Sequence, residues 1–231
     1  MNIKIYTIFK IYLLLIFSFQ YRKLAKFILL NKTLSKSQIF QDLVCLHLVN
    51  YKKNGTFIEI GGGNGVDLSN THLQEKKYNW KGIICEPDKR SQKKIRKNRC
   101  AKLEVKPITS NCGKQIYFYE EEDPYLSSIK KSKNKINSYK LNTICLNHLI
   151  SKYKIGNNID YISIDTEGNE FEILKKFNFK KYNVYFFTIE HNFNLEKRKK
   201  IKQIMKKNKF KQVYKFLSYM DDWYINTTIN K

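Results

Sequence analysis

The sequence predicts an α/β fold in which a mostly parallel sheet is covered by helices on both faces. Two observations support this prediction. Short apolar, β-branched segments alternate with helical segments of about ten residues along most of the chain. Several of these strands are apolar throughout, which is typical of parallel strands that are buried on both faces. Ligands of such sheets bind where the strands end, so a site is expected there.

The expected elements follow each other in a regular order. An amphipathic helix over residues 38–49, with Ser37 as its N-cap, leads into the first strand. Apolar runs that end in polar or turn residues predict the strands, and three- to four-residue apolar spacing predicts the helices. Strands are expected over residues 56–60, 82–86, 103–108, 160–165 and 184–190, with a closing hairpin at 210–216 and 221–226. Helices are expected over residues 70–76, 89–97, 144–153, 169–177 and 195–208. Between them, residues 109–142 predict an extra strand at 115–123 and a mobile loop or lid at 127–138.

The N-terminus differs from the rest of the chain. Residues 3–21 are nearly all apolar or aromatic, yet the uninterrupted apolar core at 11–19 is shorter than the ~20 residues that cross a bilayer. No small-residue cleavage site follows, which argues against a removed signal peptide. We therefore expect residues 1–34 to form an apolar and basic helix lying in a membrane interface, and residues 35–231 to form the domain. A membrane anchor and a helix packed on the domain are the alternatives. The cations of this segment are Lys4, Lys10, Arg22, Lys23 and Lys26.

Composition limits the partners. The 231 residues fit one domain with an appendage, and 44 Lys+Arg against 20 Asp+Glu give a net charge of +24. Only five of these cations are arginines, whereas proteins that read bases favour the planar fork of arginine. We therefore interpret the charge as solvated surface and do not expect nucleic acid as a partner.

The cysteines and histidines predict no metal site. The five cysteines are scattered, odd in number and never in a C-x-x-C pair, so we expect free thiols in a reducing compartment. The four histidines show no metal-binding spacing. The cysteines are Cys45, Cys85, Cys100, Cys112 and Cys145.

Polar residues gather at the predicted strand ends. The first strand is followed by a glycine turn at residues 61–65, the second ends at Glu86, the fourth at Asp165, and the fifth at Glu190. Because carboxyl ends of parallel strands meet at one edge of a sheet, these residues are expected to share one crevice.

The glycine turn predicts a ligand with positive charge. A dinucleotide fingerprint would need glycine at position 66, where the chain has Val66, and a phosphate-binding loop fails as well. An acid, Glu59, lies two residues before the first glycine, where it would repel phosphate. S-adenosylmethionine, with an ammonium, a sulfonium and a ribose diol, fits this turn better. Glu86 lies 21 residues after Gly65 and can accept the ribose hydroxyl protons, although NAD would require the same acid. The predicted cofactor residues are Glu59, Gly61, Gly63, Asn64, Gly65, Glu86 and Pro87.

Five segments, in this order, resemble the FkbM family of S-adenosylmethionine-dependent methyltransferases. They are SQIFQD, FIEIGGGNGVDLSNT, WKGIICEPD, IDYISIDTEGNEFEIL and FTIEHN. The similarity runs from about Ser37 to the DDWYI segment near the C-terminus. It implies a Rossmann-like class I methyltransferase with a seven-stranded sheet, a C-terminal antiparallel hairpin, and methyl transfer to an oxygen, often of a sugar or polyketide hydroxyl.

Transfer to a hydroxyl requires a base beside the departing methyl group. The candidates at the strand ends are Asp165, Glu167, Glu190 and His191. Alternatively, Asp165, Glu190 and Asn192 could bind Mg²⁺ and acidify the hydroxyl directly.

We therefore expect a methyltransferase acting on a glycan, a lipid-linked saccharide or a related small molecule. It would be cytoplasmic and held at the inner membrane face, on anionic lipid, through residues 1–30. The alternatives are a nucleotide-dependent oxidoreductase and a basic nucleic-acid- or membrane-binding module whose enzyme site has decayed.

Overall fold

The computed structural model describes residues 3–131 and 133–229, and its central feature is a seven-stranded sheet. The strand order is β3-β2-β1-β6-β7-β9-β8. The first five of these strands are parallel, and β9 runs antiparallel to both β7 and β8. This confirms the predicted mostly parallel sheet with a C-terminal antiparallel hairpin. The strands are β1 (Thr56–Ile60), β2 (Lys81–Cys85), β3 (Lys102–Glu104), β6 (Asn158–Ile164), β7 (Asn183–Glu190), β8 (Phe210–Val213) and β9 (Asp221–Asn226).

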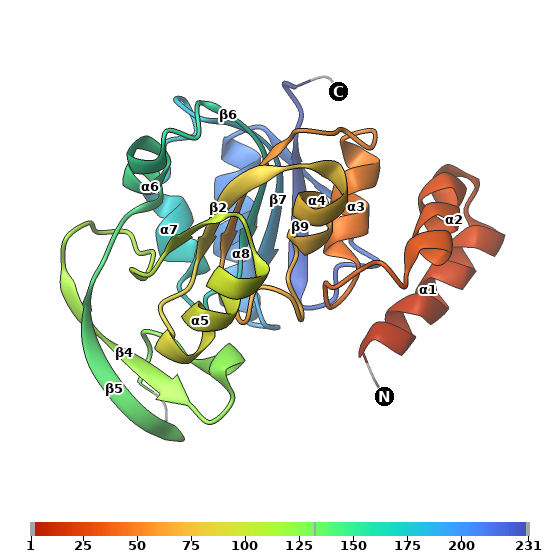
Figure 1. The fold of residues 1–231 in the computed structure, drawn as a ribbon. Helices are drawn as coiled ribbons and strands as arrows, with labels where there is room; N and C mark the ends of the chain where they lie inside the picture. Colours follow the sequence, from red (N-terminus) through yellow and green to blue (C-terminus); the bar gives the residue numbers. More distant parts are fainter. Residues whose placement is uncertain (1–2, 132, 230–231) are drawn as a thin grey trace.

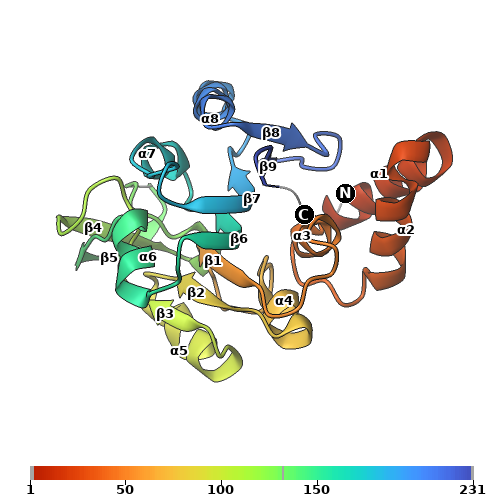
Figure 2. The same ribbon diagram turned by 90° about the horizontal axis from the view of Figure 1, so that it is seen from above.

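Helices cover both faces of the sheet (Figures 1 and 2). Successive side chains of a strand point to opposite faces, so β1 sends Ile58 and Ile60 into one core and Phe57 into the other. The first core is completed by α6, α7 and α8, and the second by α3, α4, α5 and apolar side chains of the N-terminal residues 3–31. The helices are α3 (Gln41–Leu48), α4 (His72–Tyr78), α5 (Lys89–Asn98), α6 (Leu146–Tyr153), α7 (Glu170–Lys175) and α8 (Leu195–Lys207).

Helix α3 begins later than the sequence predicted. Its N-cap is Phe40 in a left-handed conformation, not Ser37. The Ser37 hydroxyl instead donates to Oδ1 of buried Asp42 at 2.7 Å, as Ser35 does at 2.6 Å. These two serines hold the approach to the helix in an extended path.

The N-terminal segment forms a helical hairpin beside α3 (Figure 1). It consists of α1 (Ile3–Phe17), a 3₁₀ turn η1 (Phe19–Tyr21) and α2 (Arg22–Asn31), where the sequence predicted one helix. The chain turns at Ser18, which is extended, and the Arg22 side chain donates to the carbonyls of Leu15 and Ile16 at 3.2 and 3.3 Å. Arg22 thereby caps carbonyls that the end of α1 would leave without partners.

An antiparallel pair of strands projects from the domain at the lower left of Figure 1. It consists of β4 (Gln115–Glu121) and β5 (Lys135–Asn142), and the 3₁₀ turn η2 (Pro124–Leu126) follows β4. The predicted strand at 115–123 is confirmed in position. The predicted mobile loop at 127–138 overlaps the start of β5, and its Ser132 lies outside the described residues. We call residues 115–142 the extension.

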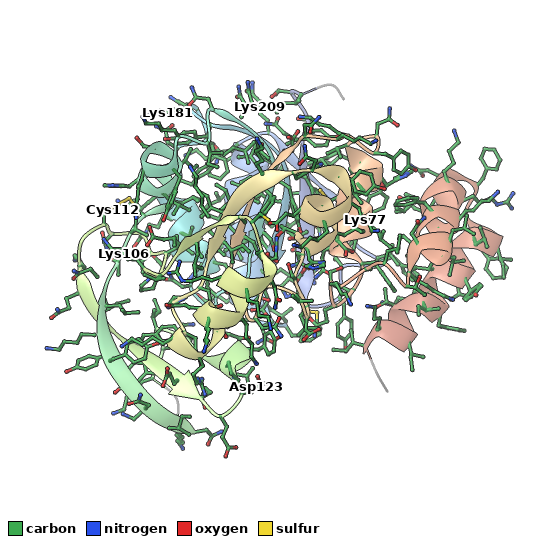
Figure 3. The ribbon with its side chains drawn as sticks, viewed as in Figure 1. Lys77, Lys106, Cys112, Asp123, Lys181 and Lys209 are labelled. Atoms are coloured by element: carbon green, nitrogen blue, oxygen red, sulfur yellow. A yellow bond between two sulfur atoms is a disulfide. The ribbon has the colours of Figure 1, made fainter. Side chains whose placement is uncertain are left out.

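A disulfide between Cys112 and Cys145 closes the base of the extension (Figure 3). The prediction of five free thiols is therefore wrong for this pair, and the compartment inferred from free thiols loses that support. Cys45, Cys85 and Cys100 are not part of a disulfide in the described chain. The two cysteines are 33 residues apart in the chain and meet because Ile108 pairs with Ile144 in a short parallel bridge.

Candidate active site

A cavity of about 360 Å³ lies at the carboxyl edge of the sheet. Its floor comes from the residues that end or follow β1, β2, β6 and β7, as the sequence predicted. Its roof comes from the extension, chiefly from Phe118 and residues 123–129. The volume lies within the range of small-molecule and cofactor sites.

The cavity is acidic in a strongly basic protein. Six carboxyl groups line it, and no Lys, Arg or His is among its described lining residues. The chain as a whole carries a charge of +24, so the excess of carboxyl groups in the cavity lining is opposite in sign to the rest of the protein. It favours a ligand with positive charge and hydroxyl donors over one with phosphates. The six residues are Asp67, Glu86, Asp123, Asp165, Glu167 and Glu190.

Glu86, at the end of β2, lies in the cavity wall as predicted. Its Oε2 accepts from the backbone N–H of Gly63 and its Oε1 from that of Asp88, both at 2.8 Å. Burial raises the pKa of this carboxyl to about 8. The two backbone donors fix the side-chain orientation and leave further lone pairs on both oxygens for hydroxyl donors of a ligand.

Asp165 and Glu190 follow neighbouring strands and meet on the cavity floor. Water reaches Asp165 through the cavity, although protein encloses it on its other sides. Burial and the neighbouring Glu190 raise the pKa of Asp165, and burial together with Glu167 raises that of Glu190. Within the described chain, Oε2 of Glu190 is buried without a hydrogen-bond partner. This cluster therefore holds protons more tightly than isolated acids do.

The structure changes the residues of the candidate metal site. Oxygens of Asp165, Glu170 and Glu190 lie within 4.8 Å of one another, and Asn192 also lines the cavity. Oε1 of Glu170 accepts from Thr166 and Gly168, and its Oε2 pairs with Nζ of Lys197 at 2.9 Å. Lys197 thus already supplies a positive charge beside the cluster. For this reason we do not carry the Mg²⁺ hypothesis further.

The predicted ligand contact of Glu59 needs correction. Glu59 is buried under the segment that follows the glycine turn and does not line the cavity. Its oxygens accept from the Ser69 and Thr71 hydroxyls and from the Asn70 backbone N–H, at 2.6–3.0 Å. Buried Arg99 lies 3.5 Å away and also pairs with Glu75. The carboxylate of Glu59 therefore organises this segment of the protein and does not face Glu86 across a ligand.

The glycine turn shapes the cavity only in part as expected. Gly61 and Gly63 line it, both with positive φ, but a Cβ at Gly61 would overlap the backbone oxygen of Asp165, and one at Gly63 the Tyr125 ring. The absent side chains thus let the protein close around the cavity. Asn64 and Gly65 lie outside the lining. Asn64 Oδ1 accepts from the N–H groups of residues 66 and 67, and Gly65 packs on Arg99 and Ile95 of α5.

His191 does not reach the cavity, which corrects its place among the candidate bases. Its side chain is buried, and Nδ1 accepts from the Phe193 N–H at 3.1 Å, which places the proton of the neutral ring on Nε2. Burial lowers the pKa of His191. Asp165, Glu167 and Glu190, the other three candidates, all line the cavity, and so does Pro87.

Sequence reasoning missed several lining residues. Asn70 lines the cavity, donates to Ser163 at 2.9 Å and has a buried Oδ1 without a partner in the described chain. Gln41 also lines it and donates to Asp221 at 3.0 Å. Gln41 lies in the SQIFQD segment, which resembles the family, but the resemblance did not indicate a role for this residue. Tyr125 could not be found, because nothing in its local sequence places it over Gly63.

The strand order and the acidic cavity at the strand ends define a Rossmann-like class I methyltransferase. A profile of the FkbM methyltransferase domain matches residues 59–222. The chain belongs to this family of S-adenosylmethionine-dependent methyltransferases, as the sequence segments predicted.

Solved methyltransferase structures resemble the chain at low sequence identity. Precorrin-6y C5,15-methyltransferase from Geobacter metallireducens is similar with a TM-score of 0.45 at 10% identity, over 84% of this chain and 90% of that one. A SAM-dependent methyltransferase from Aquifex aeolicus is similar with a TM-score of 0.41 at 10% identity, over 90% and 97%. A comparison with curated proteins gave no match.

Proposed function

We propose that this protein transfers a methyl group from S-adenosylmethionine to a hydroxyl oxygen of a saccharide or lipid-linked saccharide. The observation that carries the proposal is the cavity with six carboxyl groups and no cationic side chain among its described lining. A site for NAD would place at least one N–H-rich or cationic group against the pyrophosphate, and the glycine turn at Val66 lacks the fingerprint for it.

The residues present fit this cofactor. Glu86 lines the cavity and is held by two backbone donors that leave further lone pairs on its oxygens, which suits the two hydroxyls of a ribose. Two buried acceptors without partners in the described chain, Asn70 Oδ1 and Glu190 Oε2, belong to lining residues. Such acceptors, with Asp165 beside them, suit a ligand that brings its own N–H donors and positive charge.

Bound S-adenosylmethionine supplies an electrophilic methyl group on its sulfonium. We assign Glu190 as the base that takes the proton of the acceptor hydroxyl. It lies on the cavity floor, one of its oxygens is unpartnered, and its raised pKa makes its carboxylate a better proton acceptor than an ordinary one. Asp165 lies beside Glu190, and burial together with the charge of Glu190 raises the pKa of Asp165.

The acceptor site is assigned to the roof and the outer floor of the cavity. Tyr125 and Leu126 from the extension offer apolar surface, and Asn169 and Asn192 from the floor offer amide groups. This combination suits a polyhydroxylated ring, which presents donors and acceptors at its edge.

The experiment is to mix the purified full chain with S-adenosylmethionine and a panel of saccharides and lipid-linked saccharides. We expect release of S-adenosylhomocysteine with at least one acceptor, and NMR of the product should place the new methyl group on oxygen. A methyl group found on nitrogen or carbon would contradict the assigned acceptor atom. Binding of NADH without binding of S-adenosylmethionine, measured by calorimetry, would contradict the function itself.

A further inference from the structure

The N-terminal hairpin exposes apolar side chains where a helix packed on a domain normally exposes polar ones. Ile5, Phe9, Tyr12 and Ile16 recur at steps of four, three and four residues, so they form one stripe along α1, and all four are exposed. At the turn, Phe17 and Phe19 are 80% and 86% exposed. On its other side, α1 buries Thr7 and Ile11 fully, and Ile3, Ile8, Leu14 and Leu15 pack partly buried against the domain core. We call the exposed set of six residues the apolar face.

The cations of the hairpin fall into two sets, one directed toward the domain and one exposed next to the turn. Lys4 donates to the carbonyl of Ser35 and Lys10 to that of Phe216, so both point toward the domain. Arg22, Lys23 and Lys26 are exposed at the start of α2, next to the turn. The first acidic residue of the chain is Asp42, so seven cations precede any carboxylate. An apolar face beside unbalanced positive charge matches the surface of an anionic bilayer.

Backbone groups at the turn are paired within the hairpin. The Arg22 guanidinium satisfies two carbonyls at the end of α1, and the Ser18 N–H donates to the Leu14 carbonyl at 3.1 Å. Exposed backbone groups are costly in hydrocarbon, so this local pairing lowers the cost of insertion.

The two helices of the hairpin are separated by a sharp bend. Among the described residues, no single helix is long and apolar enough to cross a bilayer. α1 and the segment Phe19–Asn31 have the required length and apolar composition only when taken together, and a bend of 118° separates them. A helix of 15 residues is ~22 Å long, less than the ~30 Å of a hydrocarbon core.

We propose that the apolar face of α1 and the turn at residues 17–19 dock this protein on the surface of an anionic lipid bilayer. A second copy of the chain is the competing occupant, but it would bring the exposed cations Arg22, Lys23 and Lys26 close to their own copies. Tyr6 of α1 packs on Tyr219, whose neighbour Met220 lines the cavity, so docking also holds the cavity close to the membrane. The docking itself does not depend on the proposed methyl transfer.

The experiment is sedimentation of the full chain with vesicles of phosphatidylcholine, with and without about 30% phosphatidylglycerol. We expect binding to the anionic vesicles, and a loss of about tenfold or more in affinity for Phe17→Ser/Phe19→Ser, because two exposed rings leave the interface. Lys23→Gln/Lys26→Gln should weaken binding and remove part of its salt dependence.

Two matched variants serve as controls. Lys202→Gln/Lys206→Gln removes the same charge from exposed positions of α8, and Ile136→Ser removes an exposed apolar side chain from the extension. Both should bind like the unchanged protein. Brominated lipid should quench the added fluorescence of Phe17→Trp. Equal binding by all variants, no binding to anionic vesicles, or concentration-dependent self-association that Phe17→Ser/Phe19→Ser abolishes would overturn the proposal.

Discussion

Carboxylates near the ends of the parallel strands have two opposite kinds of surroundings. Beneath the glycine turn, Glu59 accepts hydrogen bonds from Ser69, Asn70 and Thr71 and lies against the Arg99 guanidinium. On the cavity side, Glu190 keeps an oxygen without a partner in the described chain, and burial raises the pKa values of Glu86 and Glu190. The hydrogen-bonding capacity of Glu59 is used by protein donors, and these bonds stabilise the fold. The carboxyl groups on the cavity side keep capacity to bind a ligand and a proton.

The largest effect is expected on the cavity side. Glu190→Gln keeps the shape of the side chain but cannot take a proton, so kcat should fall by about a hundredfold to ten-thousandfold while the Kd of the cofactor changes little. Glu172→Gln, at an exposed position of α7 outside the cavity lining, is the control and should keep most of the activity. Steady-state release of S-adenosylhomocysteine measures kcat, and calorimetry with S-adenosylmethionine measures the Kd. A variant with full kcat would remove Glu190 from the role of base.

Glu59→Ala should lower the free energy of unfolding by about 3 kcal/mol, because it leaves Arg99 and three polar donors buried without their acceptor. Urea unfolding followed by circular dichroism measures this change. At temperatures where the variant stays folded, its cofactor affinity should be close to that of the unchanged protein. A large loss of affinity without loss of stability would restore the ligand contact that the sequence predicted.

Glu86→Ala is the converse variant. It should weaken cofactor binding by about ten- to a hundredfold, since one carboxylate accepting two hydroxyl protons contributes two charge-assisted hydrogen bonds. Calorimetry with S-adenosylmethionine gives the affinity, and Glu196→Ala on the surface of α8 is the matched control. Together with Glu59→Ala, this variant separates ligand binding from stability. Unchanged affinity would show that the two carboxylates do not differ in the way described.

A smaller effect is expected from pH. The pKa of Glu86 is raised from 4.5 to about 8 in the folded protein. Its ionised form accepts the hydroxyl protons, so cofactor affinity should rise about tenfold from about pH 7 to about pH 9. Stability should move the other way, because a raised carboxyl pKa contributes stability below about pH 4.5 that is lost as the pH rises through about 8. Calorimetry and urea unfolding across this range test both, and an affinity independent of pH would contradict the assignment.

Much of the fold could be predicted from the sequence because its signals are local. Apolar runs such as Thr56–Ile60 and Asn183–Glu190 predict buried strands without knowledge of their partners. The apolar spacing in Leu195–Lys207 predicts a helix with one buried side in the same way. The helical break at Ser18 was missed, because the capping of carbonyls by Arg22 depends on a turn that composition does not reveal.

The site was predicted in place but not in detail. Parallel strands bring their carboxyl ends to one edge, so Glu86, Asp165 and Glu190 were expected to share a cavity, and they do. The sequence could not show that Glu59 and His191 turn away from it. The alternating direction of side chains along a strand, and the partners that reach a carboxylate first, are set by neighbours from distant segments.

The sequence alone determined the order of strands and helices, the family, the edge of the sheet that carries the site, and the apolar character of the N-terminus. Each of these depends on residues close together in the chain. Only the tertiary structure decided which acids remain without protein partners, that Cys112 meets Cys145, and that Tyr125 covers Gly63. These depend on contacts between segments that lie far apart in the chain, whose side chains compete in space for the same hydrogen bonds and volume.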